Sequence, residues 1–187
     1  MTASLLNILT KAEQGHDLTP AEGVALLEAR DSESLAQIRA TSARLRQQQA
    51  GETVTYVVNR NINFTNICEQ HCSFCAFRRD PDTEGAYWLS WEQILSKSAE
   101  AVAQGATEIC MQGGLHPAAQ VNGSSLHYYL RLVETIKTDF PTLHLHAFSP
   151  QEIQFIAQQD DLSYAEVITA LHQAGLDSMP GTAAEVL

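Results

Sequence analysis

From Thr53 onward the sequence alternates short strand-like runs with longer helical runs, and this alternation limits the possible folds more than any other feature. Runs rich in β-branched and aromatic residues predict strands at 53–58 with an extension to 64, at 108–111, at 143–147 and at 176–179. Capping boxes begin several of the helices between them, namely Ser90 with Gln93, Ser149 with Glu152 and Ser163 with Glu166. A strand–helix repeat of about 30 residues predicts right-handed βαβ units and a parallel sheet. The sequence therefore predicts an α/β fold, a partial TIM-like (β/α) barrel of about four strands.

The first fifty residues lack this alternation. Thr19 and Glu22 form a capping box with Pro20 at the first helical position, and leucines recur at helical spacing before and after it. The run ends in polar residues at 47–51. We therefore expect an N-terminal helical appendage over residues 1–52 and an α/β core over residues 53–187.

Composition argues against several classes of function. The 187 residues carry a formal net charge of −11, and their 11 basic residues form no long stripe, so nucleic-acid binding is not expected. No apolar run reaches the roughly 18 residues of a membrane span, and the N-terminus lacks the basic start and the apolar stretch of a signal peptide. Clustered cysteines indicate reduced thiols that serve a metal, so we expect a cytoplasmic protein.

Three cysteines, Cys68, Cys72 and Cys75, follow the first predicted strand with the spacing C-x3-C-x2-C. Fully ligated iron–sulfur clusters take four thiolates, and structural zinc sites take four protein ligands. Three thiolates on one loop can hold three irons of a 4Fe-4S cube and leave the fourth iron open to a substrate or cofactor. The alternative is a zinc site in which His71 or Cys110 supplies the fourth ligand.

Further candidate residues also follow predicted strands. Gln112-Gly113-Gly114 comes directly after the second strand, and His146 and Ser149 lie at the end of the third. Because reactive residues of such folds collect at the carboxyl ends of parallel strands, we expect these segments on the same face as the cysteine loop. Ser149 also has a simpler explanation as a helix cap. His116, in the loop after the glycines, is a weaker candidate.

The cysteine loop and its surroundings resemble the radical S-adenosylmethionine (SAM) superfamily. The runs that carry the resemblance are 59–77 with the three cysteines, 112–117 (Gln-Gly-Gly-Leu-His-Pro), 146–150 (His-Ala-Phe-Ser-Pro) and 175–185. More narrowly, they resemble the deazaflavin and menaquinone branch. The Pro-Gly-Thr-Ala-Ala-Glu run most resembles the tyrosine-using subunits of FO (deazaflavin) synthases. The resemblance covers roughly residues 53 to 187.

The resemblance implies a 4Fe-4S cluster on Cys68, Cys72 and Cys75, with SAM chelated at the open iron as the source of a deoxyadenosyl radical. It places Phe74 near the adenine of SAM. It also places the backbone of Gln112, Gly113 and Gly114 against the methionyl ammonium.

The resemblance also implies the substrates and partners. The substrates are L-tyrosine and 5-amino-6-(D-ribitylamino)uracil, and the 4-hydroxybenzyl group of tyrosine is transferred to the uracil. Protein partners are a second radical SAM subunit of FO synthase and a reduced electron donor of the flavodoxin or ferredoxin type. His146, Ser149 and His116 are the candidates for substrate contacts.

Alternatives remain open at this point. One is a radical SAM cyclase of menaquinone (futalosine) biosynthesis, and another is a metal-stabilised binding module or an inactive truncated remnant. Because a complete barrel runs to about 250 residues, we expect this chain to be an N-terminal fragment of an enzyme. We expect such a fragment alone to bind its cluster weakly and to turn over little or no substrate.

Overall fold

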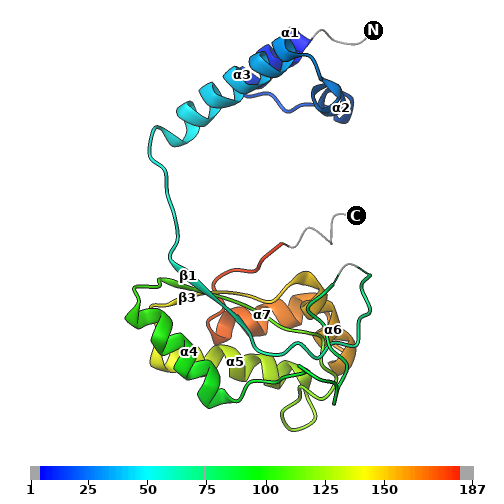
Figure 1. The fold of residues 1–187 in the computed structure, drawn as a ribbon, viewed down its shortest axis with the longest axis vertical. Helices are drawn as coiled ribbons and strands as arrows, with labels where there is room; N and C mark the ends of the chain where they lie inside the picture. The colour runs from blue at the N-terminus through cyan, green and yellow to red at the C-terminus, as the bar shows by residue number, and fades with distance from the viewer. Residues whose placement is uncertain (1–4, 74, 182–187) are drawn as a thin grey trace. The chain divides into compact units, whose positions relative to one another are not determined.

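The computed structural model describes residues 5–73 and 75–181. The chain divides into two compact units, Met1–Thr55 and Tyr56–Leu187, and each is described by itself (Figure 1). Within the described residues no helix combines the length and the apolar character that a membrane crossing requires.

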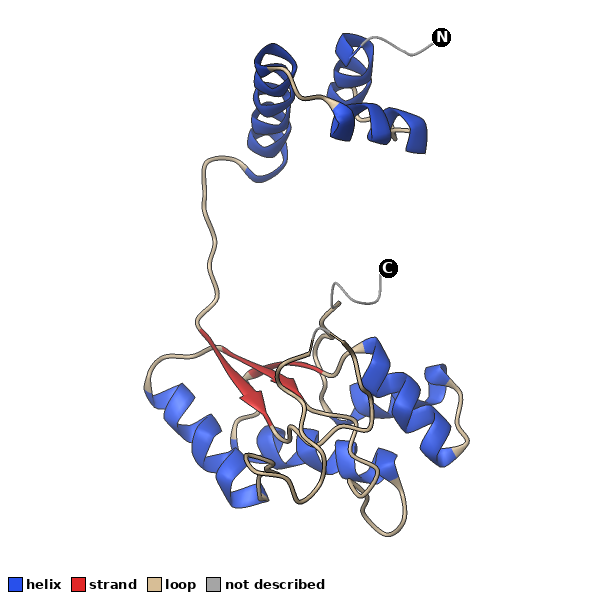
Figure 2. Cartoon of the chain, turned by 45° about the vertical axis from the view of Figure 1, so that its right-hand side comes forward, coloured by secondary structure: helices blue, strands red, loops and turns tan. Residues whose placement is uncertain are grey.

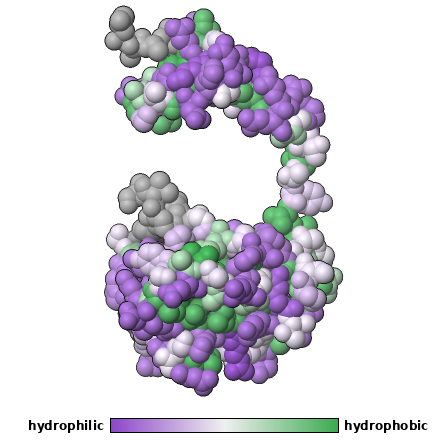
Figure 3. Space-filling model, turned by 180° about the vertical axis from the view of Figure 1, so that it is seen from behind, coloured by the Kyte–Doolittle hydropathy of each residue, from purple (hydrophilic) through white to green (hydrophobic). Residues whose placement is uncertain are grey.

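The N-terminal unit contains three helices, α1 (Leu5–Glu13), α2 (Pro20–Glu28) and α3 (Ser32–Ala50). Helix α2 begins with the predicted capping box of Thr19 and Glu22, and Asp31 caps α3. Among the described residues of this unit, those that are buried are Ile8, Leu9 and Thr41. The surface of this unit visible in Figure 3 is mainly hydrophilic. Polar contacts such as the 2.7 Å pair between Lys11 and Glu22 therefore supplement a small core.

The second unit is built on a parallel sheet in the order β1-β2-β3 (Figure 2). The strands are β1 (Asn59–Asn63), β2 (Glu108–Gln112) and β3 (His144–Ala147). Their register aligns Asn61 with Cys110 and Cys110 with His146. Helix α4 (Trp91–Ala103) connects β1 to β2, and α5 (Ser125–Asp139) connects β2 to β3. The predicted α/β fold with a parallel sheet is confirmed.

Two further helices follow β3, α6 (Pro150–Asp160) and α7 (Tyr164–Ala174). Capping boxes begin α4, α6 and α7 as the sequence predicts, through Ser90, Ser149 and Ser163. Each box satisfies two backbone N–H groups that a helix start would otherwise leave without a partner. Figure 1 shows α4 to α7 on the same side of the sheet.

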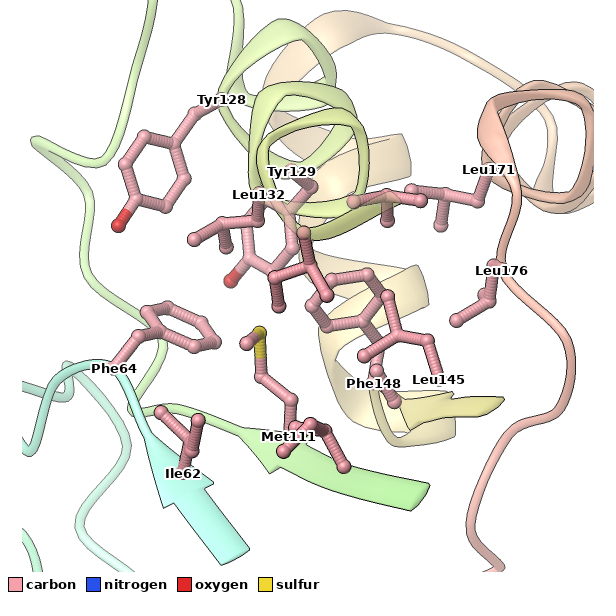
Figure 4. Packing of buried hydrophobic residues seen from close by; sticks show 14 of the residues in the cluster. Ile62, Phe64, Met111, Tyr128, Tyr129, Leu132, Leu145, Phe148, Leu171 and Leu176 are labelled. Atoms are coloured by element: carbon pink, nitrogen blue, oxygen red, sulfur yellow. The ribbon is translucent and has the colours of Figure 1, made fainter. Parts of the chain in front are cut away.

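The core lies between that side of the sheet and the helices. Ile62, Met111 and Leu145 point from the three strands toward Tyr129 and Leu132 of α5 (Figure 4). Alternation along a strand sends every second side chain to this face. Each fully buried side chain of this kind contributes about 1.5–3 kcal/mol, so the sheet–helix layer is the main stabilising element of the unit.

Two of the predicted strands, at 53–58 and at 176–179, do not form regular strands in the structure. The run 53–58 lies outside the sheet, with Val54 and Tyr56 both 87% exposed, and β1 begins only at Asn59. The predicted strand at 176–179 is reduced to a bridge between His146 and Ser178. There the Asp177 carboxylate, instead of a backbone carbonyl, accepts the Leu145 N–H at 2.7 Å. The Asp177 side chain thus takes the place of one backbone hydrogen bond between β3 and the segment 176–179, and the pairing of these two segments is shorter than predicted.

Asp160, the last residue of α6, also joins two helices. Its carboxylate accepts hydrogen bonds from the Ser124 hydroxyl at 2.6 Å, from Ser125 N–H at 2.9 Å and from Leu126 N–H at 2.8 Å. It therefore satisfies backbone donors at the start of α5, where the helix dipole favours negative charge.

We expect Asp160→Ala to lower the free energy of unfolding by about 2 kcal/mol, because donors at the start of α5 lose their acceptor. Urea denaturation followed by circular dichroism measures the change. The control is Asp139→Ala, which removes the same charge from an exposed position at the other end of α5. Equal stability of the two variants would contradict the role of Asp160.

Candidate functional site

The cysteine loop follows β1 and is fixed by two buried polar residues, Thr65 and Asn66. The Asn66 side chain donates to the Gly85 carbonyl and accepts from Tyr87 N–H, both at 2.8 Å. The Thr65 hydroxyl donates to the Tyr87 carbonyl at 2.8 Å. These hydrogen bonds join the start of the loop, at Thr65 and Asn66, to Gly85 and Tyr87 at its end. The three cysteines therefore lie between two segments that are bonded to each other.

The backbone of the loop makes further contacts on both sides. Cys68 N–H donates to the Arg79 carbonyl at 3.2 Å, and Arg79 N–H donates to the Asn66 carbonyl at 2.8 Å. The Arg79 guanidinium binds the carbonyls of Ala76 at 3.0 Å and Arg78 at 2.8 Å. Arg79 therefore organises the chain directly after the last cysteine.

The glycine turn at the end of β2 lies against this loop. A Cβ at Gly113 would clash with the Phe64 ring, with Cε1 only 2.7 Å away. A Cβ at Gly114 would lie 2.9 Å from Cys68 Cβ and 2.7 Å from the Ile67 carbonyl carbon. The turn can approach the cysteine loop this closely only because both residues lack a side chain.

The cysteine loop and the glycine turn border a cavity of about 250 Å³, which we call the cysteine cavity. Its lining also includes the start of α6. The lining residues are Cys68, Gln70, Cys72, Cys75, Phe77, Arg78, Gln112, Gly113, Gly114, Leu115, Ser149, Gln151 and Glu152. Segments from the ends of all three strands thus meet at one edge of the sheet.

The donor set of this cavity suits an iron–sulfur cluster better than one zinc ion. All three cysteines are free thiols and partly accessible. Across residues 5–73 and 75–181, no three His, Cys, Asp or Glu side chains gather closely enough for a single metal ion. A structural zinc site needs four protein ligands, whereas three thiolates on one loop can hold three irons of a 4Fe-4S cube and leave the fourth iron open.

The two residues that would complete a zinc site are engaged elsewhere. His71 is exposed, with Nδ1 3.1 Å from the Glu69 carbonyl and Nε2 3.7 Å from Asp80. Cys110 lies within β2, and burial raises the pKa of its thiol. The residues present therefore fit the predicted cluster and give no support to the zinc alternative.

Glu152 is the buried charged group of the cavity, with 1% of its surface exposed. One carboxylate oxygen accepts Gly113 N–H at 3.1 Å, and the other accepts the backbone N–H and the hydroxyl of Ser149 at 2.7 and 3.0 Å. Burial raises the pKa of the Glu152 carboxyl from 4.5 to about 7, although these hydrogen bonds act in the opposite direction. Glu152 thus joins the glycine turn to the start of α6.

The residue before Ser149 has an unusual backbone. Phe148 has φ of 63°, and its ring is fully buried against Phe64 and Tyr129. A left-handed conformation is costly for a bulky residue and persists only where packing enforces it. This bend turns the chain from β3 into α6 and so brings Glu152 back to the glycine turn.

The sheet face opposite the core is polar. Asn61, Cys110 and His146 lie side by side in register, and Asn59, Glu108 and His144 form the next row. The Ser178 hydroxyl lies 2.7 Å from His144 Nε2 and 2.7 Å from His146 Nδ1. We call these seven residues the polar sheet face. Parallel sheets are usually apolar on both faces, so the polarity of this face is unusual.

The structure brings together some of the predicted site residues and separates others. Gln112, Gly113, Gly114 and Ser149 line the cysteine cavity with the three cysteines. His146 lies on the polar sheet face instead. His116 is buried against the Trp88 ring, 4.6 Å between centroids, and burial lowers the pKa of its imidazole. Phe74 lies outside the described residues.

Several site residues were missed by the sequence analysis. The sequence predicts Glu152 only as part of a helix cap, and it predicts Arg78 to lie in a solvated turn or to contact an acidic electron donor. Asn66 and Ser178 are not among the candidates. The position of Glu152 could have indicated a role in the site, because Ser149 and Glu152 follow a predicted strand at the edge where the cysteines lie. Nothing in the sequence indicates that this capping glutamate is buried.

The sequence matches the radical SAM superfamily over residues 62–183, and the chain belongs to this superfamily. The fold agrees. The FeFe-hydrogenase maturase HydG superposes with a TM-score of 0.67 at 15% identity, covering 97% of this chain and 46% of HydG. That similarity concerns the fold alone.

Two relatives share the name 5-amino-6-(D-ribitylamino)uracil–L-tyrosine 4-hydroxyphenyl transferase. The relative from Cyanothece sp. strain PCC 7425 is 71% identical over 187 residues, which are 100% of this chain and 49% of the relative. The relative from Nostoc sp. strain PCC 7120 is 67% identical over 180 residues, 96% of this chain and 46% of the relative. The chain therefore spans about half the length of the curated relatives it matches.

We expect Gly113→Ala and Gly114→Ala each to lower the free energy of unfolding by about 1–3 kcal/mol, because the added methyl group overpacks the turn. Thermal unfolding monitored by circular dichroism measures the loss. The control is Gly181→Ala, where an added Cβ meets no atom of the described residues within 4 Å. If both turn variants were as stable as the wild type, the turn would accommodate a methyl group and the overpacking argument would be wrong.

We also expect stability to fall as pH rises from about 4.5 to 7. A carboxyl whose pKa is raised on folding binds more protons in the native state, so the native state loses its advantage as that proton leaves. The difference between 4.5 and about 7 corresponds to about 3 kcal/mol.

Urea midpoints measured across this pH range test the expectation in the wild type and in Glu152→Gln. Tyr129 and Cys110 are titratable neighbours whose pKa values the negative charge of Glu152 also raises. Because burial raises the pKa of both groups, they stay neutral across this pH range. The variant should show a flatter profile. Identical slopes would assign the pH dependence to other groups.

Proposed function

We propose that this chain is part of a radical SAM enzyme that transfers the 4-hydroxybenzyl group of L-tyrosine to 5-amino-6-(D-ribitylamino)uracil. The observation that carries the proposal is the gathering of three cysteines and the glycine turn around one cavity, in a chain 71% identical to a transferase of that name. The relatives reported above carry the transferase name, so we do not propose the cyclase of menaquinone biosynthesis.

Cys68, Cys72 and Cys75 would hold a 4Fe-4S cluster, and Gln112, Gly113 and Gly114 would border the bound SAM. When bound, the cluster and SAM would supply the radical chemistry of the reaction. The chain's own contribution is positioning. Thr65 and Asn66 fix the cysteine loop, and the glycine turn brings backbone groups close to the bound cofactor without side chains in between.

The polar sheet face is the best candidate for binding the second substrate. A ribitylaminouracil is rich in hydroxyl, amide and carbonyl groups, and such groups need hydrogen-bond partners once buried. His144, His146 and Ser178 offer both donors and acceptors. Gln112 belongs to the cavity lining, and it lies on the same face of β2 as Cys110, so the two regions adjoin.

The proposed enzyme also needs protein partners and a reducing compartment. A second radical SAM subunit would complete the deazaflavin ring, and a flavodoxin or ferredoxin-type donor would supply the electron. Thiols that ligate iron need a reducing compartment, so we place the enzyme in the cytoplasm.

Cluster binding can be tested with two cysteine variants. After anaerobic reconstitution of the full-length enzyme that contains this chain, we expect about four irons per polypeptide in the wild type, far fewer in Cys72→Ser, and an unchanged content in Cys110→Ser. Iron and sulfide analysis measures this, and electron paramagnetic resonance with and without SAM reports cofactor binding. Stoichiometric zinc, or equal iron loss in both variants, would contradict the cluster assignment.

Product formation tests the reaction itself. The full-length enzyme that contains this chain is reconstituted, reduced and incubated with SAM, L-tyrosine and the aminouracil, and the coupled product is detected by mass spectrometry. The parallel incubation contains dehypoxanthine futalosine. Conversion of futalosine in place of the aminouracil would overturn the proposed reaction while leaving the cluster assignment intact.

A further inference from the structure

The Ser178 hydroxyl lies between the imidazole rings of two histidines on the polar sheet face. Its oxygen is 2.7 Å from His144 Nε2 and 2.7 Å from His146 Nδ1. The backbone holds the serine there, because Ala147 N–H donates to the Ser178 carbonyl at 2.9 Å and Ser178 N–H donates to the Leu145 carbonyl at 3.3 Å. The three side chains therefore form one continuous hydrogen-bonded row beside β3.

A serine hydroxyl has a single proton. It can donate that proton to one of the two ring nitrogens, and it then accepts an N–H from the other. The two facing nitrogens therefore carry opposite protonation states: when His146 Nδ1 is protonated, His144 Nε2 is not. Distances of 2.7 Å lie within the range over which a side chain takes up a proton directly. A proton can thus move from one ring to the other through the hydroxyl.

The His144 end of the row is open to solvent and lies among charged groups. The side chain of His144 is 44% exposed, and its Nε2 lies 3.9 Å from a carboxylate oxygen of Glu108 on β2. The second carboxylate near this ring is that of Asp177, which pairs with Lys137 at 2.5 Å. A proton that reaches His144 therefore meets negative charge and water, so it can leave the protein there.

The His146 end of the row is less exposed and lies nearer the cysteine cavity. Its neighbour in register is Cys110, and Gln112, two residues further along the same face of β2, lines the cavity. Burial raises the pKa of the Cys110 thiol, so this group stays neutral and does not compete for a proton. Because Nδ1 of His146 is bonded to Ser178, Nε2 is the ring nitrogen left for a ligand.

We propose that His146, Ser178 and His144 form a proton relay that removes a proton from an N–H group of the ligand on the polar sheet face. The N–H bond of the ligand breaks, its electron pair stays on the ligand nitrogen, and the proton goes to His146 Nε2. His146 Nδ1 then gives its proton to Ser178, and Ser178 gives its own proton to His144 Nε2. His144 becomes neutral again by releasing its Nδ1 proton to solvent.

The identity of the ligand rests on the proposed function, in which the aminouracil carries amine and ring N–H groups. Loss of one such proton leaves a more electron-rich acceptor for the hydroxybenzyl group. Imidazole suits the task because it changes its charge between about pH 5 and pH 8. Polarity alone does not require histidine here, since Asn59 and Asn61 of β1 occupy the same two rows of the face.

The relay predicts a linked change in both rings when the aminouracil binds. Before transfer the neutral rings carry their proton on Nδ1, and after transfer and release they carry it on Nε2. Nitrogen NMR of the full-length enzyme that contains this chain, labelled with ¹⁵N at histidine, distinguishes the two forms. Omitting SAM prevents turnover, and His144→Gln and His146→Gln assign the signals. D-ribitol, which has hydroxyl groups but no N–H, is the control ligand.

We expect the aminouracil to shift the proton from Nδ1 to Nε2 in His144 and in His146. In Ser178→Ala the signal of His144 should stay unchanged, and Ser178→Thr, which keeps the hydroxyl, should restore its response. The exposed ring of His127 on α5 should not respond in any variant. A His144 ring that does not respond in the wild type, or that responds equally in Ser178→Ala, would overturn the relay.

Turnover of the reconstituted full-length enzyme gives a second readout. We expect Ser178→Ala to lower kcat by about 10- to 100-fold, the lower part of what acid–base catalysis contributes, with little change in KM for the aminouracil. Ser178→Thr should retain most of the activity. A rise in KM without a fall in kcat would assign Ser178 a structural role and overturn the relay.

The two readouts separate failure of the relay from failure of the proposed function. A wild-type enzyme that forms the coupled product while the His144 signal stays unchanged refutes the relay and leaves the proposed function intact. A cluster-loaded enzyme that forms no product refutes the proposed function, and the response of His144 to the bound aminouracil then decides the relay. An enzyme that does not bind the aminouracil refutes both.

Discussion

The close approach of the glycine turn to the cysteine loop is the constraint on which the rest of the site depends. Gly113 packs under the Phe64 ring, and Gly114 packs on the backbone of Ile67 and on Cys68. Parallel pairing of β1 with β2 brings these segments to one edge, and the absence of two Cβ atoms lets them touch. Without that contact the cysteines and the turn would border separate surfaces.

The two faces of the sheet carry different kinds of side chain. Ile62, Met111 and Leu145 bury one face against the helices, while Asn61, Cys110 and His146 place polar groups on the other. Because side chains alternate along a strand, both properties come from the same three short segments. Within the described residues, the core therefore lies on one side of the sheet and the polar sheet face on the other.

Much of the fold and part of the site could be predicted from local sequence. The capping boxes of Ser90, Ser149 and Ser163 involve residues only three apart, so they form wherever the helix begins. The fourth strand could not be predicted correctly, because Asp177 competes for a ladder N–H from a residue 32 positions away. His116 lies in a loop of the sequence as a weaker site candidate, but in the structure it is buried against the Trp88 ring. Such outcomes depend on which distant segments meet.

Local sequence is enough to predict the alternation of strands and helices, and the spacing of the three cysteines indicates the superfamily. The burial of Glu152 at the glycine turn and the position of Arg78 in the lining of the same cavity follow only from the folded chain. Ser178 likewise comes between two histidines 32 and 34 residues away. The physical reason is that periodicity and capping act over a few residues. Burial and charge pairing depend on how the chain folds back on itself.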